Sequence, residues 1–321
     1  MSFVVDKKQA RATIDAAVAK GVCTALFCTG SFWNAEAILR AADNFAKKRG
    51  IRDIPVVVAM TSNYAHMPQA KRVSRCGDAR IGFRAVMEYC KILTEGPDAP
   101  YSNVAAMTHL DHADPALDAW ALTECFGLLS SVMFDGQAYP YEENLRLTKE
   151  YVERYGENIL VEGVVEGLAV GDGKTAAQND DYIEKAARFV ENTNVDFLVA
   201  DLGTEQQSAR TEAIYLGKRA KELTKALGKP MLALHGASSL GDGQFKDFCK
   251  DGVIRANMWT RIVRESGKYA AKRLAGRIGR IEADEFEACE ATAYINDNID
   301  HAAQTMEEML DKLGYGALAE N

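Results

Sequence analysis

The sequence predicts a (β/α)8 barrel, a fold of the α/β class, on three observations. Short apolar runs alternate with segments of helical period along most of the chain. These runs are continuously apolar, which is typical of parallel strands that are covered by helices. Polar and charged residues follow several of the runs, at the strand end where barrel enzymes build their active sites. A doubly wound open sheet would give the same local pattern and is the alternative architecture.

Eight apolar runs bounded by polar residues or glycine are predicted as strands, at residues 22–28, 55–60, 103–108, 131–134, 159–165, 196–200, 230–234 and 252–256. Helical periodicity between them predicts helices at residues 34–48, 118–128, 141–155, 181–192, 210–226 and 243–250. The first strand is followed by Cys-Thr-Gly-Ser-Phe, which lacks the glycine spacing of a dinucleotide-binding turn. The repeated order of strand and helix therefore favours the barrel.

The last part of the chain has a different character. Residues 269–278 and 284–313 are rich in alanine and charged residues and have no strand between them, so they are predicted as helices. We expect one barrel domain over residues 1–321, in which residues 265–321 form a helical extension. These helices either complete the outer ring of the barrel or form a contact between subunits. A homodimer or homotetramer is expected.

The composition limits the partners and the compartment. The chain has 321 residues, of which 47% are hydrophobic and 26% are charged, as expected for a protein with a sizeable core. Its formal net charge of −8 argues against nucleic acid or an anionic membrane as a partner, because both need a clustered basic face. The seven cysteines have no paired spacing, and residues 1–13 lack the apolar core of a signal peptide. We therefore expect a cytoplasmic protein with reduced thiols.

Chemically active side chains are concentrated after the predicted strands. Three of the five histidines lie there: His109 and His112 after the third strand, and His235 after the seventh. Imidazoles and carboxylates such as Asp111 are ligands of Zn²⁺ and related transition metals. The turn at residues 236–239 is rich in small residues, whose backbone amides can approach an anion. The barrel would bring these groups to one mouth, which predicts a metal site beside an anion site.

Four stretches, taken in this order, resemble the class II, metal-dependent fructose/tagatose-bisphosphate aldolases. They are His-Leu-Asp-His at 109–112, Ser-Val-Met-Phe-Asp-Gly at 131–136 with Pro-Tyr-Glu-Glu-Asn at 140–144, Leu-His-Gly-Ala-Ser at 234–238, and Asn257. Their order and spacing are similar to the family from about residue 20 to residue 260. Phe32, Asn34 and Glu36 resemble a turn near the family's N-terminus. The resemblance implies a divergent member of this family with the same barrel.

The resemblance also implies a metal centre and a mechanism. The family holds zinc on three histidines, two of which correspond to His112 and His235. Its proton-transferring aspartate corresponds to Asp111, and its enediolate-binding asparagine to Asn257. By this analogy the metal polarises the C2 carbonyl of a ketose, Asp111 accepts the C4 hydroxyl proton, and cleavage of the C3–C4 bond leaves a metal-bound enediolate. The implied cofactor is Zn²⁺, with Co²⁺ or Mn²⁺ as alternatives.

The chain departs from the family at the third metal ligand and at the second acid after the fifth strand. Where the family has Gly-Thr-x-His, this chain has Gly-Thr-Glu-Gln at residues 203–206. Gln206 or Glu205 could supply the third ligand, which would favour metals that accept harder ligands. Of the family's Glu-x-Glu, only Glu162 is kept, and it is predicted as a ligand or as a group that supports one. The candidates for the acid that exchanges a proton with the three-carbon product are Glu166, Asp172, Asp180 and Asp181. The last three also fit a solvated acidic loop.

The substrate-binding positions imply an anionic end group. The family's Asn-x-Asp-Thr corresponds to residues 257–260, where Trp259 replaces the aspartate. Arg255 and Arg261 lie close by and could bind phosphate or sulfonate through paired donors, although Arg255 could instead point outward and be structural. The candidate substrate-binding and phosphate-binding residues are Asn34, Gly203, Gly236, Ser238, Ser239, Arg255, Asn257, Thr260 and Arg261.

The sequence therefore predicts a carbon–carbon lyase that reversibly cleaves a small anionic sugar, such as a ketose phosphate, between C3 and C4. A sugar-phosphate isomerase or epimerase on the same scaffold is an alternative, because such enzymes also pass through an enediolate. The changes at Gln206 and Trp259 motivate this alternative. A sugar-phosphate-binding protein without catalytic activity is the third possibility.

Overall fold

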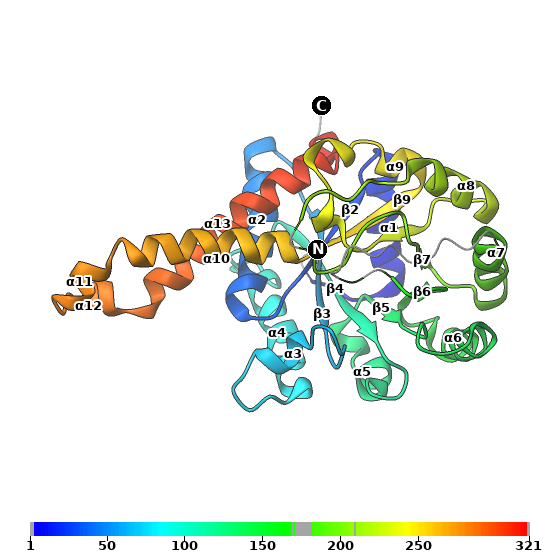
Figure 1. The fold of residues 1–321 in the computed structure, drawn as a ribbon, viewed down its shortest axis with the longest axis horizontal. Coiled ribbons are helices and arrows are strands. Elements are labelled where there is room, and N and C mark those ends of the chain that lie inside the picture. The colour runs from blue at the N-terminus through cyan, green and yellow to red at the C-terminus, as the bar shows by residue number, and fades with distance from the viewer. Residues whose placement is uncertain (1–2, 169, 171–180, 209, 320–321) are drawn as a thin grey trace.

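Eight parallel strands form a closed barrel in the computed structural model of this protein, which describes residues 3–168, 170, 181–208 and 210–319. The strands of the ring are β2 (Thr24–Cys28), β3 (Ile54–Thr61), β4 (Val104–Ala113), β5 (Ser131–Phe134), β6 (Leu160–Val164), β7 (Phe197–Val199), β8 (Leu232–Leu234) and β9 (Val253–Met258). Each strand pairs with the next along the chain, and β9 pairs with β2 to close the ring (Figure 1). The predicted barrel and its eight strands are confirmed, and an open sheet is excluded because the last strand bonds to the first.

Helices follow the strands and cover the outer face of the barrel (Figure 1). They are α2 (Phe32–Arg49), α3 (Gln69–Arg72), α4 (Ala79–Thr94), α5 (Ala119–Glu124), α6 (Tyr141–Tyr155), α7 (Tyr182–Thr193), α8 (Gly217–Leu227) and α9 (Phe248–Asp251). Short 3-10 helices lie at Phe126–Leu128, Ala237–Ser239, Asp242–Gln244 and Tyr315–Leu318. The predicted start of a helix at residue 210 is wrong, because the segment before α8 instead forms a bridge between Ala213 and Leu240.

The N-terminal segment closes one end of the barrel. β1 (Phe3–Val4) pairs with β4, and α1 (Lys7–Ala19) follows it. Ala10 and Ile14 of α1 belong to the cluster of buried side chains that fills the barrel interior. Because α1 contacts β2, β3 and β6, which lie on different sides of the ring, it covers the end at which the strands begin. Neither β1 nor α1 was predicted from the sequence.

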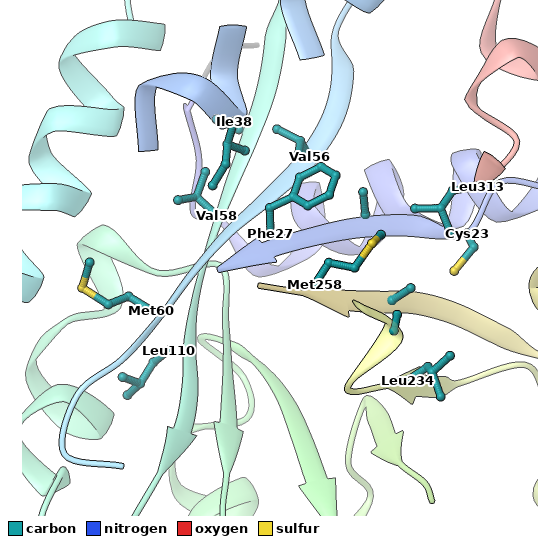
Figure 2. Close-up of a cluster of buried hydrophobic side chains, with 14 of the residues drawn as sticks. Cys23, Phe27, Ile38, Val56, Val58, Met60, Leu110, Leu234, Met258 and Leu313 are labelled. Carbon is teal, nitrogen blue, oxygen red and sulfur yellow. The ribbon is translucent and has the colours of Figure 1, made fainter. Parts of the chain in front are cut away.

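Side chains along the barrel strands alternate between the interior and the surrounding helices. In β3, Val56 and Val58 belong to the outer core together with Phe27 of β2 and Ile38 of α2 (Figure 2). Val57, between them, belongs to the interior cluster. This alternation decides which residues reach the open end of the barrel, because only the inward series continues into its mouth.

The last helices form a hairpin, here called the C-terminal hairpin, that extends away from the barrel (Figure 1). It consists of α10 (Thr260–Ala275), α11 (Ile278–Glu282), α12 (Phe286–Cys289) and α13 (Ala291–Lys312). α13 packs against α2 and α10, whereas α11 and α12 lie at the far tip. Large apolar side chains are exposed on this hairpin, and Phe286 is 80% exposed. Among the helices of the described residues, none is both long enough and apolar enough to span a membrane.

Candidate active site

Asp111 and His112 are neighbours in β4, yet both reach the barrel mouth. Asp111 continues the inward series of the strand after Met107 and His109. His112 would point outward in a regular strand, but its backbone is left-handed, with a φ of 47°. The pairing of β4 with β5 shifts register at the same place. This irregularity brings two consecutive side chains to one site.

Donor atoms from three residues converge at this mouth. Asp111, His112 and His235 each offer one ligand atom, and these atoms lie within 4.8 Å of one another. Asp111 Oδ1 and His112 Nε2 are buried without a hydrogen-bond partner, and Asp111 Oδ1 lies 4.0 Å from His235 Nδ1. Buried polar atoms normally have partners, so unpaired donor atoms that face one point indicate a ligand. Two imidazoles and a carboxylate fit a divalent metal of the zinc series.

Each of the two histidines contacts a carboxylate through the ring nitrogen that faces away from the converging donor atoms. Nδ1 of His112 lies 2.6 Å from Asp135 Oδ2, and Nε2 of His235 lies 2.9 Å from Glu162 Oε1. An ionised carboxylate only accepts hydrogen bonds, so the proton of each neutral ring belongs on the nitrogen that faces the carboxylate. The opposite nitrogen of each ring is then free to bind a metal.

The electrostatic surroundings make His112 unusually basic. Burial by itself lowers the pKa of His112, but the charge of Asp111 and the hydrogen bond with Asp135 raise that pKa to about 9. Burial raises the pKa of Glu162, and the hydrogen bond from His235 together with nearby positive charges lowers it to about 2. A metal that binds to His112 at neutral pH must therefore displace a proton.

The second carboxylate oxygen of Asp111 accepts a weak hydrogen bond from Cys28, whose Sγ lies 3.6 Å from Oδ2. Burial raises the pKa of Cys28 well above its ordinary value, so the thiol stays protonated and can donate. Cys28 was not among the predicted site residues. Its position as the last residue of β2 is the signal in the sequence that would have identified it.

A cavity lies over the donor atoms. The predicted site residues that line it are Asp111, His112, Gln206, His235, Gly236, Ser238, Asn257 and Thr260. Residues that were not predicted as site residues also line it, among them Cys28, Tyr64, Met67, Gln207 and Trp259. The ring of Tyr64 stacks on that of His112 with 4.1 Å between the centroids, which fixes the plane of the imidazole. Tyr64 was missed because it lies in the loop after β3 rather than at a strand end.

The candidates for the third metal ligand have different surroundings. Gln206 lines the cavity: its Oε1 lies 3.5 Å from the Tyr64 hydroxyl, and its Nε2 is buried without a hydrogen-bond partner. Glu205 is not part of the converging group, and its backbone amide donates to Ser239 Oγ at 3.1 Å. Glu162 lies behind His235 instead of beside the donor atoms. Gln206 thus shares the cavity with the converging donor atoms and stays a predicted ligand, whereas Glu205 and Glu162 are not among those donors.

The predicted substrate-binding residues divide into two groups. Those that line the cavity are Gly236, Ser238, Asn257 and Thr260. Those that are not part of its lining are Asn34, Gly203 and Ser239. Gly236 has a φ of 69°, and a Cβ there would lie 2.7 Å from the backbone of Glu205, so only glycine fits. The Ser239 hydroxyl is used within the turn, where it donates to the Gly236 carbonyl at 2.7 Å.

The two arginines expected at the mouth lie elsewhere. Arg255 is 1% exposed, inside the barrel, and its Nη1 lies 3.2 Å from Glu162 Oε2. Arg261 pairs with Asp242 at 2.7 Å and lines a separate hollow between α10 and α13. Neither arginine lines the cavity, so the expectation that they bind the anionic end of a substrate there is corrected. The alternative of an outward-facing Arg255 is also wrong, because the side chain lies inside the barrel beside Glu162 and Ser131.

The acidic residues predicted to exchange a proton with the three-carbon product either do not line the cavity or lie outside the described residues. Glu166 does not line the cavity, and its charge instead acts on Tyr182 and Lys185 beside α7. Asp181 immediately precedes α7 and pairs with Lys185 at 2.9 Å. Asp172 and Asp180 lie outside the described residues. The acid that returns a proton to the three-carbon product therefore stays a prediction.

Comparison with known proteins agrees with this geometry. The family described as fructose-bisphosphate aldolase class-II matches residues 8–316 of the chain. A 6-phospho-5-dehydro-2-deoxy-D-gluconate aldolase of Shouchella clausii (strain KSM-K16) is 35% identical over 191 residues, which are 57% of this chain and 61% of that protein. The match thus spans less than two thirds of that relative's length. A fructose-bisphosphate aldolase of Streptococcus pneumoniae serotype 4 is 28% identical over 317 residues, which are 94% of this chain and 95% of that protein.

Solved structures share the fold. The YdjI aldolase of Escherichia coli K12 has a TM-score of 0.68 at 22% identity and covers 97% of this chain and 98% of that one. The fructose-bisphosphate aldolase of Campylobacter jejuni has a TM-score of 0.76 at 17% identity, with 97% and 95% covered. The predicted family and enzyme class, an aldolase and hence a carbon–carbon lyase, are confirmed by the match along nearly the whole chain. This protein belongs to the class II fructose-bisphosphate aldolase family.

Proposed function

We propose that this protein is a metal-dependent aldolase that reversibly cleaves an anionic ketose phosphate, or a related sugar, between C3 and C4. The observation that carries the proposal is the convergence of Asp111, His112 and His235, whose ligand atoms lie within 4.8 Å of one another at the barrel mouth. Membership of the class II family supports the same type of reaction. Zn²⁺, Co²⁺ and Mn²⁺ are the candidate metals, because each accepts imidazole and oxygen ligands.

The residues of the chain have distinct proposed roles. A divalent cation held by His112 and His235 would polarise the ketone of the substrate and stabilise the negative charge left by bond cleavage. Asp111 Oδ1 is buried and has no hydrogen-bond partner, so it is placed to accept the proton of the C4 hydroxyl. Cys28 donates to the other oxygen of Asp111 and holds the carboxylate in that orientation. Asn257, whose amide group lies on the cavity wall and contacts His235 Nε2 at 2.9 Å, would bind a hydroxyl of the three-carbon fragment through its other amide atom.

The substrate is proposed to carry an anionic group. The names of two relatives include phosphorylated sugars: the aldolase of Shouchella clausii and a sulfofructosephosphate aldolase of Alkalicoccus urumqiensis, which is 29% identical over 174 residues, or 50% of this chain and 56% of that protein. The turn that begins at Gly236 lines the cavity with Gly236 and Ser238. Backbone amides of such turns bind anions.

The proposal is tested by metal removal and a screen of substrates. The purified protein is treated with a chelator, reloaded with Zn²⁺, Co²⁺ or Mn²⁺, and assayed for three-carbon fragments from ketose phosphates and sulfonated ketoses. Cleavage should disappear with the metal and return on reloading. Full turnover after complete metal removal contradicts the proposal. An isomerised sugar without a three-carbon fragment would instead establish an isomerase or epimerase.

A matched pair of variants tests the role of the base. Asp111→Asn should lower kcat by about 10²- to 10⁴-fold, the range expected when general base catalysis is lost. Asp114→Asn, in the same segment, is the control, because Asp114 accepts hydrogen bonds from the backbone amides of Ala116 and Leu117 and is not part of the converging group. Equal activity of the two variants would remove Asp111 from the proposed mechanism.

A further inference from the structure

We propose that Arg255 is a positioning residue that sets the metal affinity of the site through Glu162 and His235, although it touches neither the cavity nor the three converging ligand atoms. This inference rests on the proposed metal site. Burying the charge of an arginine inside a barrel costs free energy, and this role would explain why the chain has an arginine at this position.

The three residues form a continuous chain of contacts beneath the mouth. Nη1 of Arg255 lies 3.2 Å from Glu162 Oε2, and Glu162 Oε1 lies 2.9 Å from His235 Nε2. Arg255, Glu162 and His235 are 1%, 0% and 4% exposed, so no solvent competes for these contacts. The guanidinium also lies 3.4 Å from Ser131 Oγ and 4.1 Å from the centroid of the Phe197 ring, which fixes its position from two further sides.

Glu162 is therefore held at both of its carboxylate oxygens. Arg255 binds one oxygen, which leaves the other directed at His235 Nε2. His235 Nε2 lies 2.9 Å from this oxygen and also 2.9 Å from Asn257 Nδ2. Because the carboxylate oxygen can only accept, Nε2 carries the ring proton, the Asn257 amide turns its oxygen to that proton, and Nδ1 presents its lone pair on the side of Asp111, 4.0 Å away. Without Arg255, the carboxylate would lose its fixed orientation, and His235 would lose the contact that selects its metal-binding form.

The chain offers a close control for this arrangement. Arg11 of α1 lies 4.8 Å from the centroid of the same Phe197 ring and pairs with Asp196 at 2.9 Å. Arg11 thus shares the aromatic and ionic contacts of Arg255 but has no contact with Glu162 or His235. If both arginines had only a structural role, replacing Arg255 and replacing Arg11 should have similar effects on Zn²⁺ binding. The positioning role predicts an effect on metal binding from Arg255 alone.

The test measures the Zn²⁺ dissociation constant of the metal-free full-length protein by competition calorimetry, together with the thermal unfolding midpoint. Arg255→Met should weaken Zn²⁺ binding by about 10- to 100-fold, the range found when residues that orient a metal ligand are lost. Arg255→Lys should restore most of the affinity, because a cation is returned to Glu162. Arg11→Met should keep the wild-type dissociation constant, whatever its effect on the unfolding midpoint.

A dissociation constant of folded Arg255→Met equal to that of the wild type would overturn the inference. If Arg255→Met does not fold, the double variant Glu162→Gln/Arg255→Met is measured in its place, because it removes both buried charges. A wild-type dissociation constant for the double variant would also overturn the inference. Weakening by Arg11→Met to the same extent would also overturn it. If the wild-type protein binds no Zn²⁺, Co²⁺ or Mn²⁺, the proposed function fails, which is distinguishable from failure of the inference alone.

Discussion

His112 has a left-handed backbone near the C-terminal end of β4, and this local irregularity brings its side chain to the site. A side chain larger than glycine in this conformation costs roughly 1–2 kcal/mol. The strain is offset locally by the 2.6 Å contact with Asp135 and by the stacking of Tyr64 on the ring. A glycine at this position would relieve the backbone but would remove a metal ligand.

The raised pKa of His112 predicts that metal affinity depends on pH. The protonated ring is favoured below a pKa of about 9 in the metal-free protein, so binding must release this proton. The apparent association constant for Zn²⁺ should rise by up to about tenfold per pH unit between pH 6.5 and 8.5 and level off near pH 9. Calorimetry in buffers of different ionisation enthalpy would measure both the affinity and the proton release. A flat profile would contradict the assigned role of His112.

The raised pKa of His112 also affects the stability of the metal-free protein, and this effect has the opposite pH dependence. Since the folded-state pKa of His112 lies above the ordinary value of 6.5, its protonation stabilises the fold. This contribution is fully present below pH 6.5 and is lost as the pH rises through about 9. Metal binding and metal-free stability should therefore change in opposite directions over this range.

Gln206 occupies the position of the family's third histidine, and replacing it predicts a gain of affinity. Gln206→His would place an imidazole on the cavity wall, where the present Nε2 is buried without a hydrogen-bond partner. Imidazole is a stronger ligand than a carboxamide for zinc, so Zn²⁺ should bind at least about tenfold more tightly. Competition with a chromogenic chelator would measure this. Gln207→His, which changes the adjacent cavity residue, is the control and should have no comparable effect.

Some residues of the site could be predicted from the sequence, and others could not for a physical reason. Asp111, His112 and His235 were found because each follows a predicted strand, and their convergence agrees with that prediction. Arg255 was placed at the mouth in error. Arg255 precedes Asn257 by two residues and shares its inward face, but it lies deeper in the barrel, where it contacts Glu162 and Ser131 instead of the cavity. The depth that a strand residue has in a barrel depends on the tilt and stagger of the strands, which a single sequence does not specify.

The C-terminal hairpin has exposed apolar side chains that the barrel does not cover. Ile278, Phe286, Tyr294 and Ile295 are 51%, 80%, 37% and 40% exposed. We expect these side chains to contact a second copy of the chain, because clustered exposed apolar residues commonly mark an interface. The oligomer expected from the sequence would thus use the hairpin.

The introduction of charges on the hairpin tests this interface. The double variant Ile278→Asp/Phe286→Asp should lower the mass measured by light scattering from that of an oligomer to that of the monomer, because buried carboxylates are costly. Ile92→Asp is the control, since Ile92 is 69% exposed on α4, away from the hairpin. A wild-type protein that is already monomeric would contradict the expectation.

The elements that sequence patterns missed are short or have mixed composition. β1 has two residues, Phe3 and Val4, which are too few for a periodic signal. α4 is amphipathic, with Phe83, Val86, Met87 and Cys90 buried along one face, but it was not singled out between the second and third strands. The strands were predicted more reliably because continuous apolar runs stand out against charged helices.

For the whole molecule, the metal should contribute to stability as well as to catalysis. Asp111 and His112 lie on β4 and His235 directly follows β8, so a bound ion would link strands that lie apart in the ring. Zn²⁺ at 1,000 times its dissociation constant would add about 4 kcal/mol to the free energy of unfolding. Differential scanning calorimetry should show a rise of several degrees in Tm on loading. His235→Ala should lose most of this response, and an unchanged Tm of the wild type would contradict the metal site.

Packed side chains fill the barrel interior and α1 covers the end at which the strands begin, so the cavity over the donor atoms is reached from the opposite end. In the proposed cleavage, both products would therefore leave through the opening by which the sugar entered.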